Sequence, residues 1–170
     1  MPLPIAHGLL GASLVVAVHP QPARRYLTPL LAGAFLANAA DLDFVLVFAL
    51  RSKAWHRSFS HSITFALVVG LIFVLSCGRR YLREAVAYGL AFASHGVLDY
   101  LTTKEGGGVE LLWPFSADRL SFGWVGLSEL PSRLPAMEIV KSLAVEFILF
   151  MPLLVLVIGL RRYAGKERAG

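Results

Sequence analysis

The sequence predicts an all-α protein, an integral membrane bundle of four to five helices, and three observations support this. Of the 170 residues, 56% are hydrophobic and only 16% are charged. The mean hydropathy is +0.66, far above that of an average soluble protein. The apolar residues form long stretches without a period-two alternation, which favours helices over a membrane barrel. A chain of this length is expected to form one domain, 1–170.

Five apolar stretches predict the helices in order. They lie at about 3–18, 26–50, 61–77, 85–101 and 139–160. A membrane-crossing helix needs roughly 20 residues. The second and fifth stretches are therefore long enough to cross unaided, and the third and fourth are at the short end. The first is short enough to be a half-buried or interfacial helix.

The connection from about 102 to 138 is rich in glycine and proline and predicts an ordered loop or a re-entrant segment. It contains Gly106-Gly107-Gly108, Trp113-Pro114-Phe115, Pro131 and Pro135. Trp113 and Trp124 suit either the membrane interface or the entrance to a site.

Basic residues predict which end of the bundle faces the cytoplasm. If all five stretches cross, one face carries two short turns and a tail with Arg24, Arg25, Arg79, Arg80, Arg83, Arg161, Arg162, Lys166 and Arg168. The other face carries Arg51, Lys53, Arg57, Lys104, Arg119, Arg133 and Lys141, mostly over a longer connection. Basic residues in short loops stay inside, so the first face is expected to be cytoplasmic. The dispersed basic residues lack an aromatic platform, so no nucleic-acid partner is expected.

Ionisable side chains within apolar stretches are costly and therefore indicate a functional site. They are His7 in the first stretch, Asp41 and Asp43 at the close of the second, His56 and His61 around the start of the third, and His95 and Asp99 at the end of the fourth. Up-and-down threading places all of them at the non-cytoplasmic end. Four separate regions of the sequence are thus predicted to meet in one layer.

The spacing within this layer leaves several roles open. His95 and Asp99 are four residues apart, so on a helix they can bind one ion or hydrogen-bond to each other. Asp41 and Asp43 point about 200° apart on an ideal helix. Both can serve one ion only where the helix is irregular. Otherwise they serve two ions, or one of them orients a histidine.

Other polar residues have a functional and a structural interpretation. His56 and His61 lie on either side of a predicted helix start, with Ser58 or Ser60 as the N-cap. Arg57 beside them suits a phosphate or carboxylate, although a plain surface arginine is the commoner explanation. Glu146, inside the fifth stretch, is a candidate metal ligand or general base, or a polar contact within the bundle.

The candidate ligands are imidazoles and carboxylates. Cys77 is the only cysteine, so a thiolate cluster and an internal disulfide are excluded. Zinc, manganese and iron all accept these ligands. Seven candidate side chains exceed the four that a tetrahedral ion needs, which favours two ions over one. Two ions about 3.5–4 Å apart would suit phosphoester cleavage.

These residues resemble the YdjM-like family. The resemblance rests on His7 in PIAHGLLGASL, Asp41-Leu42-Asp43, His56-Arg57 with His61-Ser62, Ser94-His95 with Leu98-Asp99, and the run LLWPFSADRLSFGW. It extends from His7 to about Trp124. Members are inner-membrane proteins regarded as metal-dependent hydrolases, some under SOS control. The family is regarded as distantly related to zinc-dependent phospholipase C and the fungal single-strand nucleases.

The resemblance implies the helical fold of zinc-dependent phospholipase C, zinc as the ion, and hydrolysis of a phosphoester, including those of lipids. It implies ligands among His7, Asp41 or Asp43, His56 or His61, His95 and Asp99. The related secreted enzymes have a second His-x-x-x-Glu pair, where this chain has Ser142 before Glu146. They also bind metal through an N-terminal tryptophan, which this chain lacks. A full three-zinc centre is therefore not expected.

The predicted function is a multi-pass inner-membrane hydrolase that uses one or two metal ions. Its partners would be membrane lipid and a lipid or phosphoester substrate, with Asp41 or Asp43 as the base and Arg57 at the anionic group. One alternative is a metal-ion or proton-coupled transporter, although such sites usually lie near the midplane between repeated halves. A third is a non-catalytic membrane protein with a structural metal site.

Overall fold

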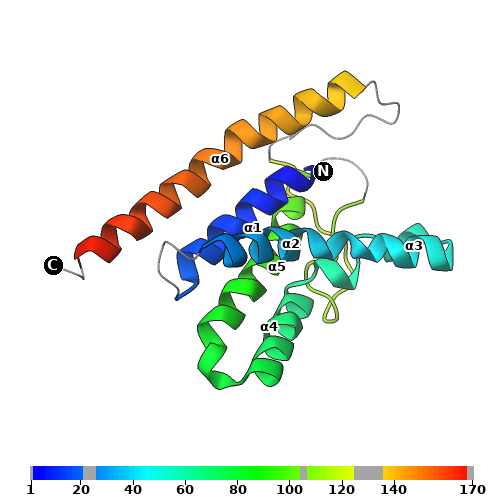
Figure 1. Ribbon diagram of the computed structural model, residues 1–170. Coiled ribbons are helices and arrows are strands. Elements are labelled where there is room, and N and C mark those ends of the chain that lie inside the picture. The colour runs from blue at the N-terminus through cyan, green and yellow to red at the C-terminus, as the bar shows by residue number, and fades with distance from the viewer. Residues whose placement is uncertain (1, 21–25, 104–106, 125–135, 168–170) are drawn as a thin grey trace.

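The structure is a computed structural model that describes residues 2–20, 26–103, 107–124 and 136–167. This part of the chain is all-helical, apart from one isolated bridge between Val109 and Leu120 (Figure 1), and the predicted fold class is confirmed. The α-helices are α1 Pro4–Val18, α2 Leu27–Asn38, α3 Phe44–Leu50, α4 Ile63–Cys77, α5 Leu82–Thr102 and α6 Ala136–Glu167. Short 3-10 turns join them: η2 Ala39–Asp43, η3 Lys53–Trp55, η4 Phe59–His61 and η5 Arg79–Tyr81.

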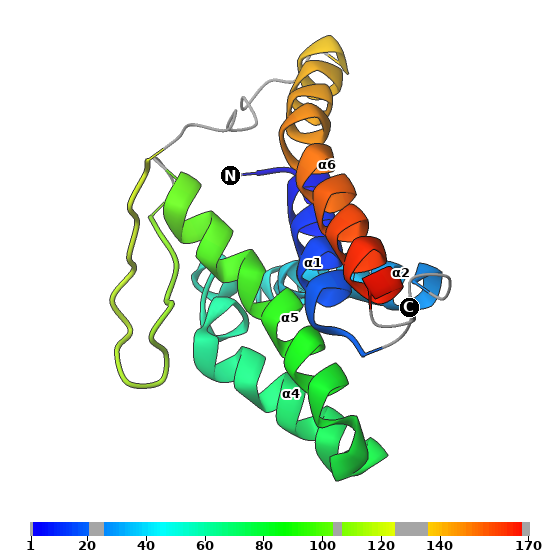
Figure 2. The same ribbon diagram turned by 90° about the vertical axis from the view of Figure 1, so that its left-hand side faces the viewer.

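Helix α1 lies at the centre of the bundle and packs against α2, α5 and α6 (Figures 1 and 2). Its contact with α2 is made through glycine. A Cβ added to Gly11 would lie 2.6 Å from the Gly33 carbonyl oxygen, and one added to Gly33 would lie 2.8 Å from the Gly11 oxygen. Small residues that let two backbones meet are typical of helix packing in membranes.

Helix α6 runs parallel to α1 and binds both of its ends. The Glu146 carboxylate accepts the backbone N–H groups of Leu3 and Ala6, the latter at 3.0 Å. Arg161 Nη2 donates to the carbonyl oxygen of His19 at the other end of α1, at 2.5 Å. An anion at the N-terminus and a cation at the C-terminus both offset the dipole of α1. The two contacts fix the position of α1, which carries His7.

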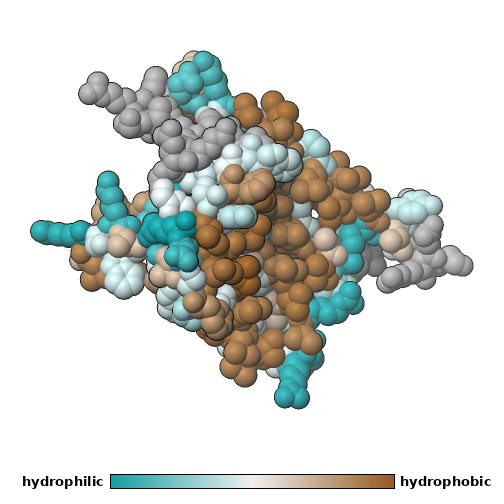
Figure 3. All heavy atoms as spheres, turned by 180° about the vertical axis from the view of Figure 1, so that it is seen from behind, coloured by the Kyte–Doolittle hydropathy of each residue, from teal (hydrophilic) through white to brown (hydrophobic). Residues whose placement is uncertain are grey.

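The outer surface is strongly apolar. No residue of α3 is buried, and Phe48 is 78% exposed. Figure 3 shows a broad hydrophobic face on one side of the molecule. Two helical runs in the described residues, Leu27–Leu50 and Met137–Gly165, are long and apolar enough to cross a membrane. The bent pair Lys53–His61 and Ile63–Cys77 gives a third if it forms one span.

The second apolar stretch was predicted to form one helix with Asp41 and Asp43 at its end. The structure of this stretch differs. Its helix is interrupted by η2, and α3 continues for seven residues beyond the acids. The turn places the Asp43 carboxylate against the backbone N–H of Arg57 and the hydroxyl of Ser60. The helix thus changes from α to 3-10 where Asp43 accepts hydrogen bonds from distant residues. The periodicity of the sequence alone does not reveal this change.

Two further details concern the loops around α4. The N-cap of α4 is Ser62, whose Oγ accepts the Phe65 N–H at 3.0 Å, and the prediction of Ser58 or Ser60 was wrong. Within the connection predicted at 102–138, residues 107–124 form an irregular arm beside the bundle (Figure 2). Residues 104–106 and 125–135 lie outside the described residues.

Candidate metal centre

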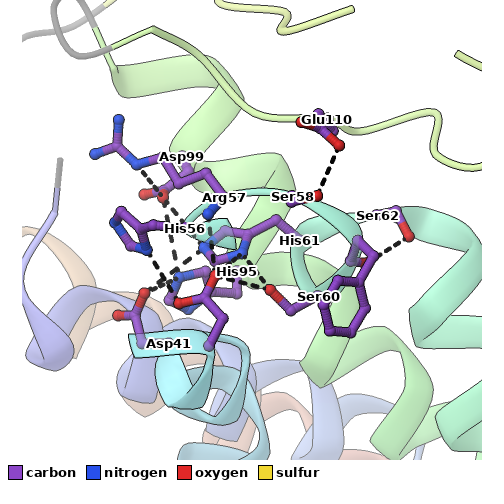
Figure 4. A network of polar contacts seen from close by, with 12 residues as sticks. Asp41, His56, Arg57, Ser58, Ser60, His61, Ser62, His95, Asp99 and Glu110 are labelled. Atoms are coloured by element: carbon purple, nitrogen blue, oxygen red, sulfur yellow. Dashed lines mark hydrogen bonds and ion pairs between the residues drawn. The ribbon is translucent and has the colours of Figure 1, made fainter. Parts of the chain in front are cut away.

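The structure brings the predicted ionisable side chains together. His7 comes from α1, Asp41 and Asp43 from η2, His56 and Arg57 from the loop after η3, His61 from η4, and His95 and Asp99 from α5 (Figure 4 shows most of them). All are buried except Asp41 and His56, which are partly exposed. The four separate regions of the sequence therefore meet in one polar cluster inside an apolar bundle.

Four side-chain atoms in this cluster point at a common space. Asp41 Oδ1 lies 3.6 Å from His61 Nε2 and 3.4 Å from His95 Nε2. Asp99 Oδ2 lies 3.7 and 3.9 Å from the same two nitrogens. None of the four atoms has a hydrogen-bond partner among the described residues. Ligands bound at about 2.0–2.2 Å around a tetrahedral ion are separated by about 3.3–3.6 Å. The two Asp41 distances fall within this range, and the two Asp99 distances lie slightly above it.

Both histidines are oriented by the ring nitrogen that faces away from the cluster. His95 Nδ1 lies 2.6 Å from the Ala37 carbonyl oxygen, which can only accept, so this nitrogen carries the proton. His61 Nδ1 lies 3.0 Å from Ser60 Oγ, whose hydroxyl donates to Asp43 Oδ2 at 2.9 Å. Partners of this kind hold the ring and the tautomer of metal-binding histidines. Each Nε2 is thereby left as an acceptor that faces the shared space.

Asp43 differs from Asp41 in that protein donors surround it. Its Oδ2 accepts the Arg57 N–H at 3.0 Å, and its Oδ1 lies 3.0 Å from His56 Nδ1. Asp43 therefore has the role that the sequence left open for one of the two acids, namely orienting a histidine, here His56. Asp41, with its Oδ1 unpartnered and its side chain 22% exposed, is the acid that is open to a ligand.

Arg57 lies at the edge of the cluster with most of its side chain buried. Its Nε is 3.6 Å from Asp99 Oδ2. Its backbone has φ 60°, a left-handed conformation that is costly for a residue with a Cβ. Two backbone hydrogen bonds support it: its N–H donates to Asp43, and its carbonyl accepts the Glu110 N–H at 3.0 Å.

Gly96 is a site residue that the sequence reasoning missed. A Cβ at this position would lie 2.0 Å from the His61 carbonyl oxygen. Only glycine allows η4 to approach α5 closely enough for His61 to reach His95. A glycine directly after His95 in a helix was the available signal, because glycine in a helix interior usually has a packing reason.

Glu110 and Arg119 were also missed as supports of the site. Glu110 Oε2 accepts the Ser58 hydroxyl at 2.8 Å, and Arg119 lies 3.4 Å from Glu110 Oε1. Arg119 also donates to the carbonyl oxygens of Ala54 and His56 at 2.8 and 3.2 Å. These contacts attach the 107–124 arm to the loop that carries His56 and Arg57.

Three other candidates make contacts outside the cluster or are largely exposed. Both carboxylate oxygens of Glu146 accept N–H groups at the start of α1, which corresponds to the polar contact within the bundle. Trp124 is 73% exposed, and Trp113 packs against Phe59 with ring centroids 5.9 Å apart.

The chain is similar in sequence to known inner membrane proteins. Residues 1–167 match the family described as the YdjM inner membrane protein. The chain is 36% identical over 113 residues to the inner membrane protein YbcI of Escherichia coli (strain K12). That alignment covers 62% of this chain. It spans 64% of the length of YbcI, which is less than two thirds. No solved structure matches the chain.

Proposed function

Because the chain belongs to the YdjM inner membrane protein family, we propose that it is a membrane-embedded, metal-dependent hydrolase of phosphoester bonds in a lipid or envelope component. The observation that carries this proposal is the set of four unpartnered atoms from Asp41, His61, His95 and Asp99. Orphaned acceptors in a buried site are costly unless a cation satisfies them. Zinc suits this donor set best, with manganese and iron as alternatives.

A divalent ion held by these four residues would need to accept a fifth ligand, as catalytic zinc can, and would then polarise a phosphoester and lower the pKa of water bound to it. The residues around it have separate tasks. Arg57, beside Asp99, would bind an anionic oxygen of the substrate, since guanidinium groups pair well with phosphate. Asp43, acting through Ser60, keeps the proton of His61 on Nδ1.

His56 is suited to accept the proton of the attacking water. Its side chain is 20% exposed, and its Nδ1 contacts Asp43 at 3.0 Å. One of its ring nitrogens lies within 4.8 Å of ligand atoms of Asp41 and His61. The Asp43 carboxylate would hold the ring and stabilise the imidazolium that forms, as in other aspartate–histidine pairs.

An apolar groove supports a lipid as the substrate. It lies between α4 and α5, has a volume of about 380 Å³, and is lined almost entirely by apolar side chains such as Leu67 and Val86. Ile63 and Ala93, which line it, are two residues from His61 and His95 respectively. An acyl chain in this groove would place its ester end near the metal centre.

The test uses detergent-purified protein, elemental analysis, and two substrates: phosphatidylglycerol vesicles and bis(p-nitrophenyl) phosphate. The wild type should hold zinc and cleave at least one substrate. Asp41→Asn and His95→Asn should lose bound zinc and lower the rate by at least about 100-fold. Asp118→Asn, an exposed acid in the arm, is the control. A zinc-loaded wild type without hydrolysis of either substrate, or an active His95→Asn, would contradict the proposal.

Ion transport is a second candidate that one observation favours. The helical run Leu27–Leu50 is interrupted at η2, and Asp41 lies at this break. Broken helices that carry ion sites within a span are features of secondary transporters. Zinc uptake into proteoliposomes that Asp99→Asn abolishes, without any hydrolysis, would replace the hydrolase by a transporter.

A further inference from the structure

Helix α3 projects from the bundle without protein cover (Figure 1). Its seven residues are all apolar, none is buried, and Val45, Phe48 and Leu50 are each more than half exposed. Among the described residues, α3 packs mainly against the adjoining turns η2 and η3. A helix that is apolar on every side is stable inside a protein core or inside a membrane, and not in water. The surroundings of α3 must therefore come from outside the bundle.

Two features identify these surroundings as lipid. First, α3 is the final part of the run Leu27–Leu50, which is long and apolar enough to cross a membrane. Second, the exposed cations Arg51 and Lys53 follow directly, then Trp55, and neither α3 nor η3 contains an acidic residue. Cations and tryptophan at the end of an apolar segment are typical of the level of the lipid headgroups. The local positive charge complements anionic phospholipid.

A second copy of the chain fits α3 less well than lipid does. Helices that pair within a membrane meet through small residues, which let their backbones approach closely. Ala49 is the only small residue of α3, and the other six are bulkier apolar residues. The α3 surface therefore suits mobile acyl chains better than a closely packed helix.

We propose that α3 is inserted among the acyl chains of a lipid leaflet, that Arg51 and Lys53 contact the phosphates of anionic phospholipids, and that the metal centre lies inside this leaflet at the base of α3. A helix rises 1.5 Å per residue, so the seven residues of α3 span about 10 Å. The turn η2, which carries Asp41, is therefore on the order of 10 Å below the headgroups.

The opening of the cluster faces the same lipid. Its two partly exposed members are Asp41 and His56. Asp41 lies in the turn that leads into α3, and the His56 ring packs on the Phe44 ring with centroids 4.2 Å apart. A substrate then reaches the metal centre sideways from the bilayer, which favours a membrane lipid over a soluble phosphodiester. Only this consequence for the substrate rests on the proposed function, because the insertion of α3 requires no activity.

The test of insertion measures depth with nitroxide spin labels. Val45→Cys, Phe48→Cys and Leu50→Cys are made in a Cys77→Ser background, labelled, and reconstituted into liposomes of phosphatidylglycerol and phosphatidylethanolamine. All three labels should be accessible to oxygen and protected from a water-soluble nickel chelate. Their depth should fall by about 7 Å from the first position to the last, at 1.5 Å per residue. A label at Ser116→Cys in the arm is the control and should be accessible to the nickel chelate.

The headgroup contact is tested by lipid composition. A fluorophore on Ser52→Cys, in the same background, is quenched by brominated phosphatidylglycerol or brominated phosphatidylcholine. The anionic lipid should be enriched about 5-fold or more around the label, since each cation near an anionic surface contributes roughly this factor. Arg51→Gln/Lys53→Gln should remove the preference. Arg162→Gln, an exposed cation at the end of α6, should retain it. Equal quenching by both lipids in the protein with its native cations would overturn the contact with anionic phospholipid.

The other outcomes also decide between the alternatives. Nickel-accessible labels along α3 would place it in water, and a common depth for all three would lay it flat on the surface. Protection from both oxygen and nickel would show a protein partner or a second copy on α3. Each of these results overturns the insertion. Hydrogen exchange of the α3 amides in unlabelled wild type in liposomes should be slow, and fast exchange would contradict insertion without any substitution. A protein that passes these tests but binds no metal keeps the inserted α3 and loses only the proposed function.

Discussion

Asp41 and Asp43 are two residues apart, yet their environments give them different roles. The η2 turn leaves Asp41 Oδ1 without a partner, while Asp43 collects the N–H of Arg57 and the hydroxyl of Ser60. The sequence was enough to predict that these acids would meet the histidines. It could not predict which acid stays open, because that depends on hydrogen bonds from a loop 14 to 17 residues away.

Asp43 should act on the metal site only through its neighbours. Asp43→Asn weakens the hydrogen bonds that hold Ser60 and, through it, His61. We expect zinc affinity to fall about 10- to 100-fold, as for other residues that orient metal ligands. Competition with a chromophoric chelator measures this change. Ser60→Ala should shift affinity in the same direction, and Ser58→Ala, whose hydroxyl binds Glu110 instead, should not. Unchanged affinity in Asp43→Asn would remove it from the site.

Among the secondary-structure elements, α6 and η4 make tertiary contacts that the sequence did not predict. Hydropathy predicts the existence of the α6 helix, but not that it binds both ends of α1 through Glu146 and Arg161. Hydropathy likewise marks α5 without revealing that η4 rests on its backbone at Gly96. Both features depend on contacts distant in sequence, which local periodicity does not encode.

The cap that Glu146 provides should be measurable as stability. Glu146→Ala leaves two N–H groups at the start of α1 without a protein acceptor, and an unsatisfied buried donor costs about 1–3 kcal/mol. The free energy of unfolding in mixed detergent micelles should fall by about this amount. Glu138→Ala on the same helix, where the acid is exposed and pairs with Lys141, is the control and should change little. Equal effects of the two substitutions would contradict the capping role.

Gly96→Ala tests the approach of η4 to α5. Its methyl group would overlap the His61 carbonyl oxygen, so η4 must move away and carry His61 with it. We expect loss of stoichiometric zinc while far-UV circular dichroism stays helical. Gly159→Ala in α6, where an added Cβ meets nothing within 4 Å, should retain zinc. A Gly96→Ala protein with wild-type zinc content would show that the close approach is dispensable.

The arrangement of the whole molecule was predicted best, because composition and hydropathy act over many residues at once. The all-α membrane bundle and the meeting of four sequence regions were both foreseen. The break at η2 within Leu27–Leu50 was only one of the alternatives left open by the two acids, because the mean hydropathy of the whole run still fits a single span. The orientation in the membrane stays a prediction that rests on the basic residues of the short turns.

Cys77 allows this orientation to be tested with the native sequence. It is exposed at the end of α4, next to Arg79 and Arg80, and is the only cysteine of the chain. A membrane-impermeant maleimide should label it in inverted inner-membrane vesicles and not in intact spheroplasts. Ser116→Cys in a Cys77→Ser background should give the reverse pattern. Labelling of Cys77 from the outside would place the metal centre at the cytoplasmic end.

The most direct test of the central claim, that Asp41, His61, His95 and Asp99 form a tetrahedral metal site, is a cobalt(II) titration followed by visible absorption. We predict for the wild type intense d–d bands typical of tetrahedral nitrogen and oxygen ligation, which are lost in His95→Asn. Weak octahedral bands alone, or bands unchanged without His95, would contradict the assignment.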